Sequence, residues 1–405
     1  GYIQACRHAN GRDWWVIVPE WNSNCYYTIL VSPDGVSSPQ KHCTGPTQGD
    51  HDWGASVGFS PDGQWFARSL PWIKGSLGYI SLFSFDRCTG ELTHSVTLNF
   101  PTEEPFYTGL SFSPNNRFLY ASTLKSLWQF DLSKPDIQNT GVLAGRVTTG
   151  SFPGQGSLFF QQLAPDGRIY IACPGSHKFL STIHYPDRLG TECVFKEYDL
   201  KLPIGSNNWM GLQNYPNYLL GPLDGSGCDT LGINNIPVAY FRYEPDSINR
   251  FEFEFTNLSY FEPEMFHWDF GDTSESDLKD PLHEFREYGT YKVCLSVTNE
   301  YGSDTFCRTI NLIPTSLNNL LNDDILLIYP NPVDDELNIS INNNLSFPIH
   351  FKLFGLEGNL YSDAANIHTD NFQINTSSFP DGIYILKMME QNGVTHVIKL
   401  FISHF

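Results

Sequence analysis

Residues 54–69 read GASVGFSPDGQWFARS, and variants of this stretch recur along the first half of the chain. An apolar segment leads into a Ser-Pro-Asp-Gly turn. A second segment follows in which large residues alternate, which is the two-residue period of a half-buried β-strand. Pro61 fixes φ at the first corner of the turn, and Asp62 and Gly63 tolerate the left-handed backbone that a tight reversal needs. The stretch therefore predicts a β-hairpin.

Further copies of this turn lie at nearly constant spacing. Gly11, Gly63, Asn116 and Gly167 occupy the same place in four copies, 52, 53 and 51 residues apart, and Pro216 begins a degenerate fifth copy. A period near 50 residues made of short strands is typical of a β-propeller, in which each repeat is one four-stranded blade. We expect four blades in residues 1–222. Because the chain enters its first turn at once, we interpret them as part of a larger ring of about seven blades whose earlier part is not represented.

Composition limits the classes of partner. The 405 residues carry a formal charge of −20, and 15% of them are aromatic. Without a basic stripe to displace counterions from phosphates, a nucleic-acid partner is not expected. No apolar run approaches the roughly 18 residues of a membrane-spanning helix, so no membrane span is expected either. The acidity fits a solvated surface, with loose Ca²⁺ binding by surface carboxylates as the alternative.

Nine cysteines occur without the CxxC pairs that zinc sites use. Cys294 and Cys307 flank one turn, and Cys25 and Cys43 flank another, so each pair is expected to face across paired strands. Two disulfides of this kind would stabilise the fold by roughly 3 kcal/mol each and indicate an oxidising compartment. An odd number remains, so we expect one cysteine to have its partner in the missing N-terminal portion; the remaining five are Cys6, Cys88, Cys173, Cys193 and Cys228.

The periodicity ends in a Gly- and Asp-containing stretch, residues 223–236, which we interpret as a linker. Residues 237–313 contain alternating strands with the spacing of a small β-sandwich. A second linker rich in Asn and Ser covers residues 314–324, and another all-β unit with the pattern of a small β-sandwich covers 325–405. The chain is therefore predicted to be all-β, with a propeller followed by two smaller β domains.

The middle domain carries three short motifs: HWDFGD at 267–272, PLHEF at 281–285 and GTYKV at 289–293. With these motifs it resembles a PKD domain. The resemblance implies an Ig-like sandwich that acts outside the cell as a spacer or weak binding module. Asp269 and Asp272 in the first motif are interpreted as structural hydrogen-bonding groups at a strand end, with a structural Ca²⁺ as the alternative.

The last unit opens with the sequence YPNP at 329–332 and ends on a strand with the sequence VIK at 397–399. With this pattern it resembles the type A sorting domain of type IX secretion substrates in Bacteroidetes. The resemblance implies export across the outer membrane, recognition by the type IX secretion machinery and location at the cell surface or outside the cell. The chain runs a few residues past the usual terminal lysine. The residues that carry the resemblance are Tyr329, Pro330, Asn331, Pro332, Gly382, Tyr384 and Lys399.

The motifs HANGRDWW at 8–15 and FDRCTGEL at 85–92 make the first half similar to propeller–PKD–sorting-domain proteins of the same bacteria. That family normally has more propeller before the HANGRDWW motif, which agrees with an incomplete ring.

Two stretches of the propeller are candidate binding sites. Asp13 beside Trp14 and Trp15 could hydrogen-bond and stack on a sugar; the alternative is that these aromatic side chains pack between blades. Residues 50–52, Asp50, His51 and Asp52, could ligate a metal or transfer protons from an inter-blade loop; the alternative is a solvated loop.

Ser56 lies in a G-x-S-x-G pattern, but Pro61 and a turn follow within five residues, where a nucleophile elbow needs a helix. We therefore expect no catalytic Ser56. Because the sequence motifs do not make up a catalytic constellation, we also expect no enzyme activity and no cofactor beyond a structural Ca²⁺. The expected function is non-enzymatic binding or assembly at the cell surface, with an extracellular glycan or surface protein as partner. The alternative is a polysaccharide hydrolase or lyase with carboxylates at the propeller mouth.

Overall fold

The computed structural model describes residues 3–47, 56–73, 76–98, 109–148, 157–173, 178–203, 206–208, 211–212, 215–246, 249–312, 326–329, 333, 335–341, 347–355, 358–369, 371–391 and 395–404. These residues form strands and connecting segments, with two single turns of 3-10 helix, η1 (Ile137–Thr140) and η2 (Gly190–Cys193). The predicted all-β class is confirmed.

The first two sequence repeats each form one antiparallel sheet whose strands follow one another in chain order. The first sheet contains β1 (Gln4–Arg7), β2 (Trp14–Pro19), β3 (Cys25–Ser32) and β4 (Gly35–Val36), and β5 (Gln40–Cys43) also pairs with β3. The second contains β6 (Val57–Phe59), β7 (Trp65–Ile73), β8 (Ser76–Phe85) and β9 (Leu92–Leu98).

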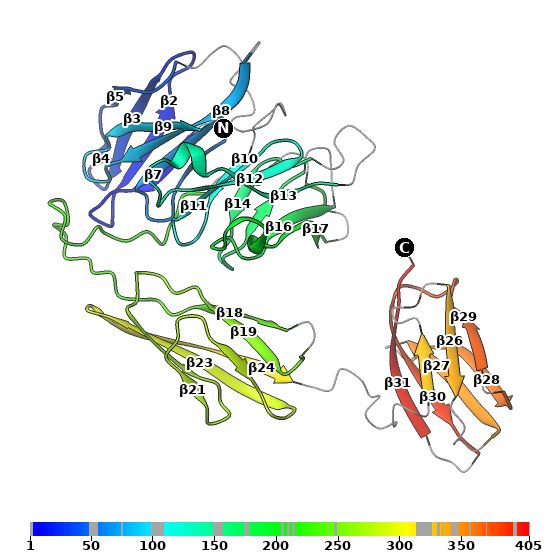
Figure 1. The fold of residues 1–405 in the computed structure, drawn as a ribbon. Coiled ribbons are helices and arrows are strands. Elements are labelled where there is room, and N and C mark those ends of the chain that lie inside the picture. The colour runs from blue at the N-terminus through cyan, green and yellow to red at the C-terminus, as the bar shows by residue number, and fades with distance from the viewer. Residues whose placement is uncertain are drawn as a thin grey trace. The chain divides into compact units, whose positions relative to one another are not determined.

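The third and fourth repeats have the same organisation. The third sheet contains β10 (Gly109–Phe112), β11 (Phe118–Ser122), β12 (Ser126–Asp131) and β13 (Val142–Arg146). The fourth contains β14 (Gln161–Leu163), β15 (Ile169–Ile171), β16 (Phe179–Ile183) and β17 (Phe195–Lys201). First strands of consecutive sheets contact one another, β1 with β6, β6 with β10 and β10 with β14, which is how propeller blades are arranged. Figure 1 labels the last of these pairs, with β10 beside β14.

The predicted turns join the first and second strands of each blade. Gly11, Gly63, Asn116 and Gly167 have φ values of 75°, 73°, 62° and 76°, all in the left-handed region that the turn chemistry predicts. The hydrophobic core lies between blades; for example, Trp15 and Tyr26 of blade 1 pack with the aromatic residues of blade 2. The described residues form four blade-like sheets that do not close into a ring, so the number of blades in the propeller stays a prediction.

The degenerate fifth copy forms no strand in the described part of residues 206–223. Instead, residues 215–228, which we call the return segment, lie against the turns of blades 1 and 2. Asn217 Nδ2 donates to the carbonyl of Pro61 (2.8 Å), and the Leu223 amide donates to the carbonyl of Ala9 (2.8 Å). The beginning of the stretch that we interpreted as a linker is therefore held on the propeller.

The middle domain has the predicted two-sheet sandwich. One sheet has the order β18 (Phe241–Pro245), β19 (Glu252–Asn257), β22 (Leu282–Glu284). The other has the order β21 (Glu275–Ser276), β20 (Met265–Asp269), β23 (Gly289–Asn299), β24 (Gly302–Leu312). Phe241, Phe255 and Trp268 are fully buried between the sheets, and their rings contact one another.

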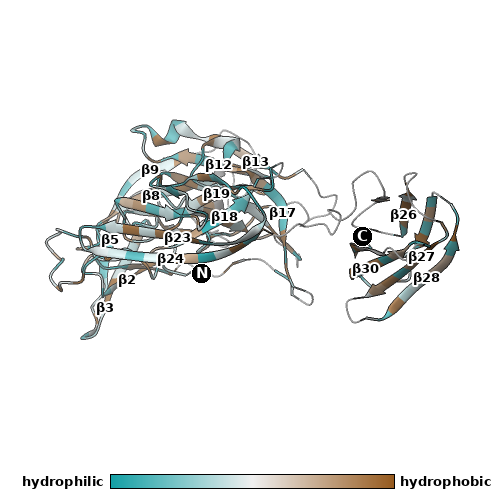
Figure 2. Ribbon diagram, turned by 90° about the horizontal axis from the view of Figure 1, so that it is seen from below, coloured by the Kyte–Doolittle hydropathy of each residue, from teal (hydrophilic) through white to brown (hydrophobic). Residues whose placement is uncertain are grey.

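The C-terminal unit is a second small sandwich, described by itself. One sheet has the order β25 (Leu326–Tyr329), β26 (Glu336–Ile341), β29 (Asn371–Asn375), and the other β28 (Leu360–Ile367), β27 (Ile349–Gly355), β30 (Gly382–Met389), β31 (Thr395–Ile402). Buried and partly exposed residues alternate along β27, and Figure 2 shows hydrophobic and hydrophilic residues mixed along these strands.

Candidate functional site

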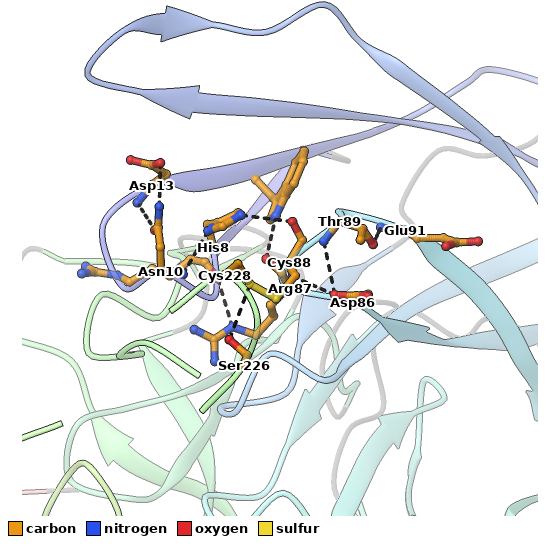
Figure 3. Close-up of a disulfide and its surroundings, with 12 residues drawn as sticks. His8, Asn10, Asp13, Asp86, Arg87, Cys88, Thr89, Glu91, Ser226 and Cys228 are labelled. Carbon is orange, nitrogen blue, oxygen red and sulfur yellow. Dashed lines mark hydrogen bonds between the residues drawn. A yellow bond between two sulfur atoms is a disulfide. The ribbon is translucent and has the colours of Figure 1, made fainter. Parts of the chain in front are cut away.

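The turn between β1 and β2 is built by its own side chains. Asn10 Oδ1 accepts hydrogen bonds from the amides of Arg12 and Asp13, both at 3.0 Å, and Asn10 Nδ2 donates to Asp13 Oδ2 at 2.8 Å (Figure 3). Arg12 Nε donates to Asp13 Oδ1 at 2.8 Å. This guanidinium holds the pKa of the buried Asp13 carboxyl below its usual range. Asp13 therefore stabilises the turn in its ionised form.

Trp15 packs between blades 1 and 2. Its side chain is 2% exposed, its Nε1 donates to the carbonyl of Arg87 (2.9 Å), and its ring covers Gly90, where an added Cβ would lie 2.8 Å from the ring. A sugar has no access to this ring, so the predicted stacking role of Trp15 is wrong. The alternative stated with it, packing between blades, describes Trp15 correctly.

Trp14 points to the opposite face of β2, as alternation along a strand requires. It is partly exposed, and its ring meets that of Tyr218 edge to face with centroids 5.6 Å apart. Tyr218, on the return segment, is 62% exposed. We call Trp14 and Tyr218 the aromatic patch. Tyr215, three residues before Tyr218, is exposed as well.

Arg7 fixes the aromatic patch in place. Its guanidinium carbon lies 4.7 Å from the centroid of the Trp14 ring, at cation–π distance. Its Nη1 donates to the carbonyl of Gly11 (2.8 Å) and its Nη2 to the carbonyl of Tyr218 (2.9 Å). One side chain therefore ties the Tyr218 backbone to the first turn. The sequence motifs gave no signal for Tyr218, because it reaches Trp14 only when the chain returns from blade 4.

The return segment is anchored beside the patch by a buried arginine and a disulfide (Figure 3). Arg87 is 4% exposed; its Nε donates to the carbonyl of Arg7 (3.0 Å), its Nη1 to that of Asp62 (3.4 Å) and its Nη2 to that of Gly221. Burial lowers the pKa of this guanidinium. Cys88, the next residue, forms a disulfide with Cys228 of the return segment.

The two predicted disulfides, Cys25–Cys43 and Cys294–Cys307, are both present. The Cys88–Cys228 bridge is a third, which the sequence reasoning left unassigned. Burial raises the pKa of the remaining thiols, to about 12 in Cys6 and to about 11 in both Cys173 and Cys193, which makes them unreactive core groups.

Of the other candidate residues, one group lies outside the part of the chain that the structure describes, and Ser56 lies within it. Asp50, His51 and Asp52 lie outside the described residues. Ser56 directly precedes β6, and the Ser-Pro-Asp-Gly turn and β7 follow that strand, so the nucleophile elbow is absent there, as expected. In the parts of the chain that the structure describes, no group of three or more His, Cys, Asp or Glu side chains could hold a metal ion.

Asp269 and Asp272 are engaged in the middle domain. Asp269 Oδ1 accepts the amide of Gly271 (2.8 Å). Asp272 accepts the amide of Ser274 (3.0 Å) and bonds His283 Nε2 (2.9 Å). Both carboxylates are hydrogen-bonded within the domain, which is the structural role that we expected of them.

The sorting-motif residues are only partly described. Pro330, Asn331 and Pro332 lie outside the described residues, and the backbone of Tyr329 ends β25. Gly382 begins β30, in which Tyr384 is buried and donates from its hydroxyl to the carbonyl of Pro380 (2.7 Å). The Lys399 ammonium, on β31, lies 4.9 Å from the Phe401 ring centroid.

Two family models match the chain. Residues 235–313 match the PKD domain, and residues 327–403 match the Secretion system C-terminal sorting domain. The chain is therefore exported by type IX secretion to the cell surface or the extracellular space. None of the helical turns in the described ranges is long and apolar enough to cross a membrane.

Several solved structures are similar to parts of the chain. The PKD1 domain from the Vibrio cholerae metalloprotease PrtV is 29% identical, with 19% of this chain and 98% of that chain covered and a TM-score of 0.18. A protein from Lactobacillus plantarum (11% identity, 91% and 85% covered) has a TM-score of 0.31. The β-propeller domain of Myceliophteria thermophila Cps50 (Swd1), at 11% identity with 76% and 84% covered, has a TM-score of 0.29. At these TM-scores, the propeller assignment rests on the sheet topology. No curated protein matches the chain.

Proposed function

We propose that this exported protein is a non-enzymatic binding protein that recognises an extracellular glycan through its aromatic patch. The carrying observation is the exposed ring of Tyr218, which meets the Trp14 ring edge to face and whose backbone is held by Arg7. An exposed aromatic ring offers apolar surface and a π-face to the C–H groups of a sugar ring. The guanidinium of Arg12, which is partly exposed, supplies polar groups on the same turn.

Rigidity supports a binding role. The Tyr218 backbone is bonded to Arg7, and the same segment is tied to blade 2 by Arg87 and by the Cys88–Cys228 disulfide. A site that is already in its bound conformation loses little conformational entropy on binding. The patch is therefore suited to hold a repeating polymer such as a polysaccharide without rearrangement.

The carboxylate at this site does not favour catalysis. A glycoside hydrolase needs two carboxyl groups on either side of the scissile bond. Asp13 is buried and bonded to Arg12 and Asn10. The alternative function, a polysaccharide hydrolase or lyase, would depend on carboxylates that other loops bring to the propeller mouth.

The test is a panel of purified polysaccharides assayed for both binding and release of reducing ends. We expect saturable binding without release, and Tyr218→Ala should weaken binding roughly tenfold, the equivalent of about 1.4 kcal/mol of stacking. Trp21→Ala is the matched control, because Trp21 is equally exposed, at 62%, and lies just beyond β2. Release of reducing ends would establish the alternative. Equal loss in both variants, or no binding to any glycan, would overturn the proposal.

A further inference from the structure

A buried arginine of the PKD domain hydrogen-bonds to the fourth blade. Arg242, on β18, is 7% exposed. Its Nη1 donates to the carbonyl of Asp166 in the blade-4 turn (3.0 Å), and its Nη2 donates to the carbonyl of His184 just after β16 (2.8 Å). The guanidinium carbon lies 5.6 Å from the centroid of the Tyr185 ring. The PKD domain thus bonds directly to the backbone of the propeller.

The same contact is made inside the propeller by blade 2. Asp62 and Asp166 hold the same place in the Pro-Asp-Gly turns, and Arg87 of blade 2 donates to the carbonyl of Asp62 just as Arg242 donates to that of Asp166. A buried guanidinium therefore bonds the turn aspartate's carbonyl in both blades. In blade 2 it comes from the blade's own hairpin, and in blade 4 it comes from the PKD domain.

The hairpin of blade 4 explains why its guanidinium comes from the PKD domain and not from the blade itself. Trp15 of blade 1 donates to the carbonyl of Arg87, and Tyr120 of blade 3 donates from its hydroxyl to the carbonyl of Pro186 (2.9 Å). Arg87 and Pro186 therefore hold equivalent places in the hairpins of blades 2 and 4. Proline has no group that could bond the Asp166 carbonyl. Arg242 supplies the missing donor.

Further contacts surround Arg242. Glu244, also on β18, forms an ion pair with Arg168 and accepts the Tyr185 hydroxyl at 2.8 Å. Arg188 of blade 4 forms an ion pair with Glu254 of β19. The Leu258 side chain covers Gly167, where an added Cβ would lie 2.5 Å from Leu258 Cδ2. The contact surface thus combines a buried charge, ion pairs and close apolar packing.

Burying a guanidinium is costly, and the bonds from Nη1 and Nη2 to two blade-4 carbonyls offset part of that cost only in a fixed geometry. We propose that the PKD domain is the C-terminal cap of the propeller, supplying to blade 4 the contact that blade 2 receives from its own hairpin. In this role it is part of the propeller's folding unit and not a flexible spacer. The blade-4 turn then depends on the PKD domain for its protection from solvent.

The test compares Arg242→Ala with Arg286→Ala in the full chain by calorimetry and by hydrogen exchange. Arg286 is an exposed arginine of the same domain and serves as the matched control. We expect Arg242→Ala to separate one shared unfolding transition into two, and to speed exchange of the Gly167 amide at least tenfold. The equivalent amide of Gly63 in blade 2 should be unaffected. The same behaviour in both variants would show an independent spacer and overturn the proposal.

A second pair of variants covers the case in which Arg242→Ala does not fold. Arg188→Glu places two negative charges together at the Glu254 contact and should speed exchange in the blade-4 turn. Adding Glu254→Arg restores an ion pair and should return exchange toward the wild-type rate. If the double variant exchanges as fast as Arg188→Glu alone, the two domains do not dock as proposed.

Discussion

Replacing Cys88 and Cys228 by serine is expected to destabilise the protein more than removing either of the short-loop disulfides, Cys25–Cys43 or Cys294–Cys307. The Cys88–Cys228 bridge joins residues 140 positions apart, whereas the separations in the other two bridges are 18 and 13. A crosslink lowers the entropy of the unfolded chain by an amount that grows with the logarithm of the closed loop. This relation gives about 5 kcal/mol for the long loop and about 3 kcal/mol for each short one.

Equilibrium urea unfolding followed by tryptophan fluorescence measures the difference, because the buried Trp15 lies against the hairpin that carries Cys88. Cys25→Ser/Cys43→Ser is the matched control, a bridge within one blade. The long-range variant should lose roughly 2 kcal/mol more than the control. It should also become sensitive to proteases in the return segment, since only noncovalent contacts would then hold it. An equal or smaller loss would refute the loop-entropy reasoning.

Two further predictions concern the turns and pH. In urea unfolding, Gly63→Ala should lower the free energy of unfolding by about 1 kcal/mol or more beyond the loss in Gly225→Ala. Both glycines have positive φ, but only a Cβ at Gly63 would meet a neighbour, Cys6 Sγ at 2.8 Å. Equal losses in the two variants would show that backbone strain alone is responsible. The Arg117 hydrogen bond lowers the pKa of Asp131 to about 2, so its stabilising contribution is complete above the unfolded value near 4 and is lost as the pH falls toward 2. The stability difference between wild type and Asp131→Asn, measured by urea unfolding at several pH values, should therefore narrow over that window, and a constant difference would contradict the assignment.

The features that the sequence predicted well are local ones. A Pro-Asp-Gly turn needs a left-handed residue wherever it occurs, and Gly11 and Gly63 adopt that conformation. The Cys25–Cys43 bridge follows from the same logic, because a turn at the midpoint of two cysteines brings them into register; Cys25 and Cys43 are direct partners across β3 and β5.

The site was only partly predictable because its members come from distant segments. Alternation places Trp14 and Trp15 on opposite faces of β2, but it does not tell which face the next blade covers. Gly90, which receives the Trp15 ring, and Tyr218, which meets Trp14, lie some 75 and 200 residues further along the chain. The Cys88–Cys228 pairing is missed for the same reason, since no turn lies midway between the two residues to signal it.

Unpaired turn carbonyls explain why so many contacts gather on one face of the blades. A tight reversal leaves some of its carbonyls without a ladder partner, and a buried carbonyl must find a donor elsewhere. In this chain the donors are side chains of other segments, Arg7, Arg87, Asn217 and Arg242, bonding the turn carbonyls of Gly11, Asp62, Pro61 and Asp166. The face where the blades turn is therefore the face where the return segment and the PKD domain attach. Since the return segment brings Tyr218 to Trp14, the carbonyls of the repeated turn also determine where the aromatic patch forms.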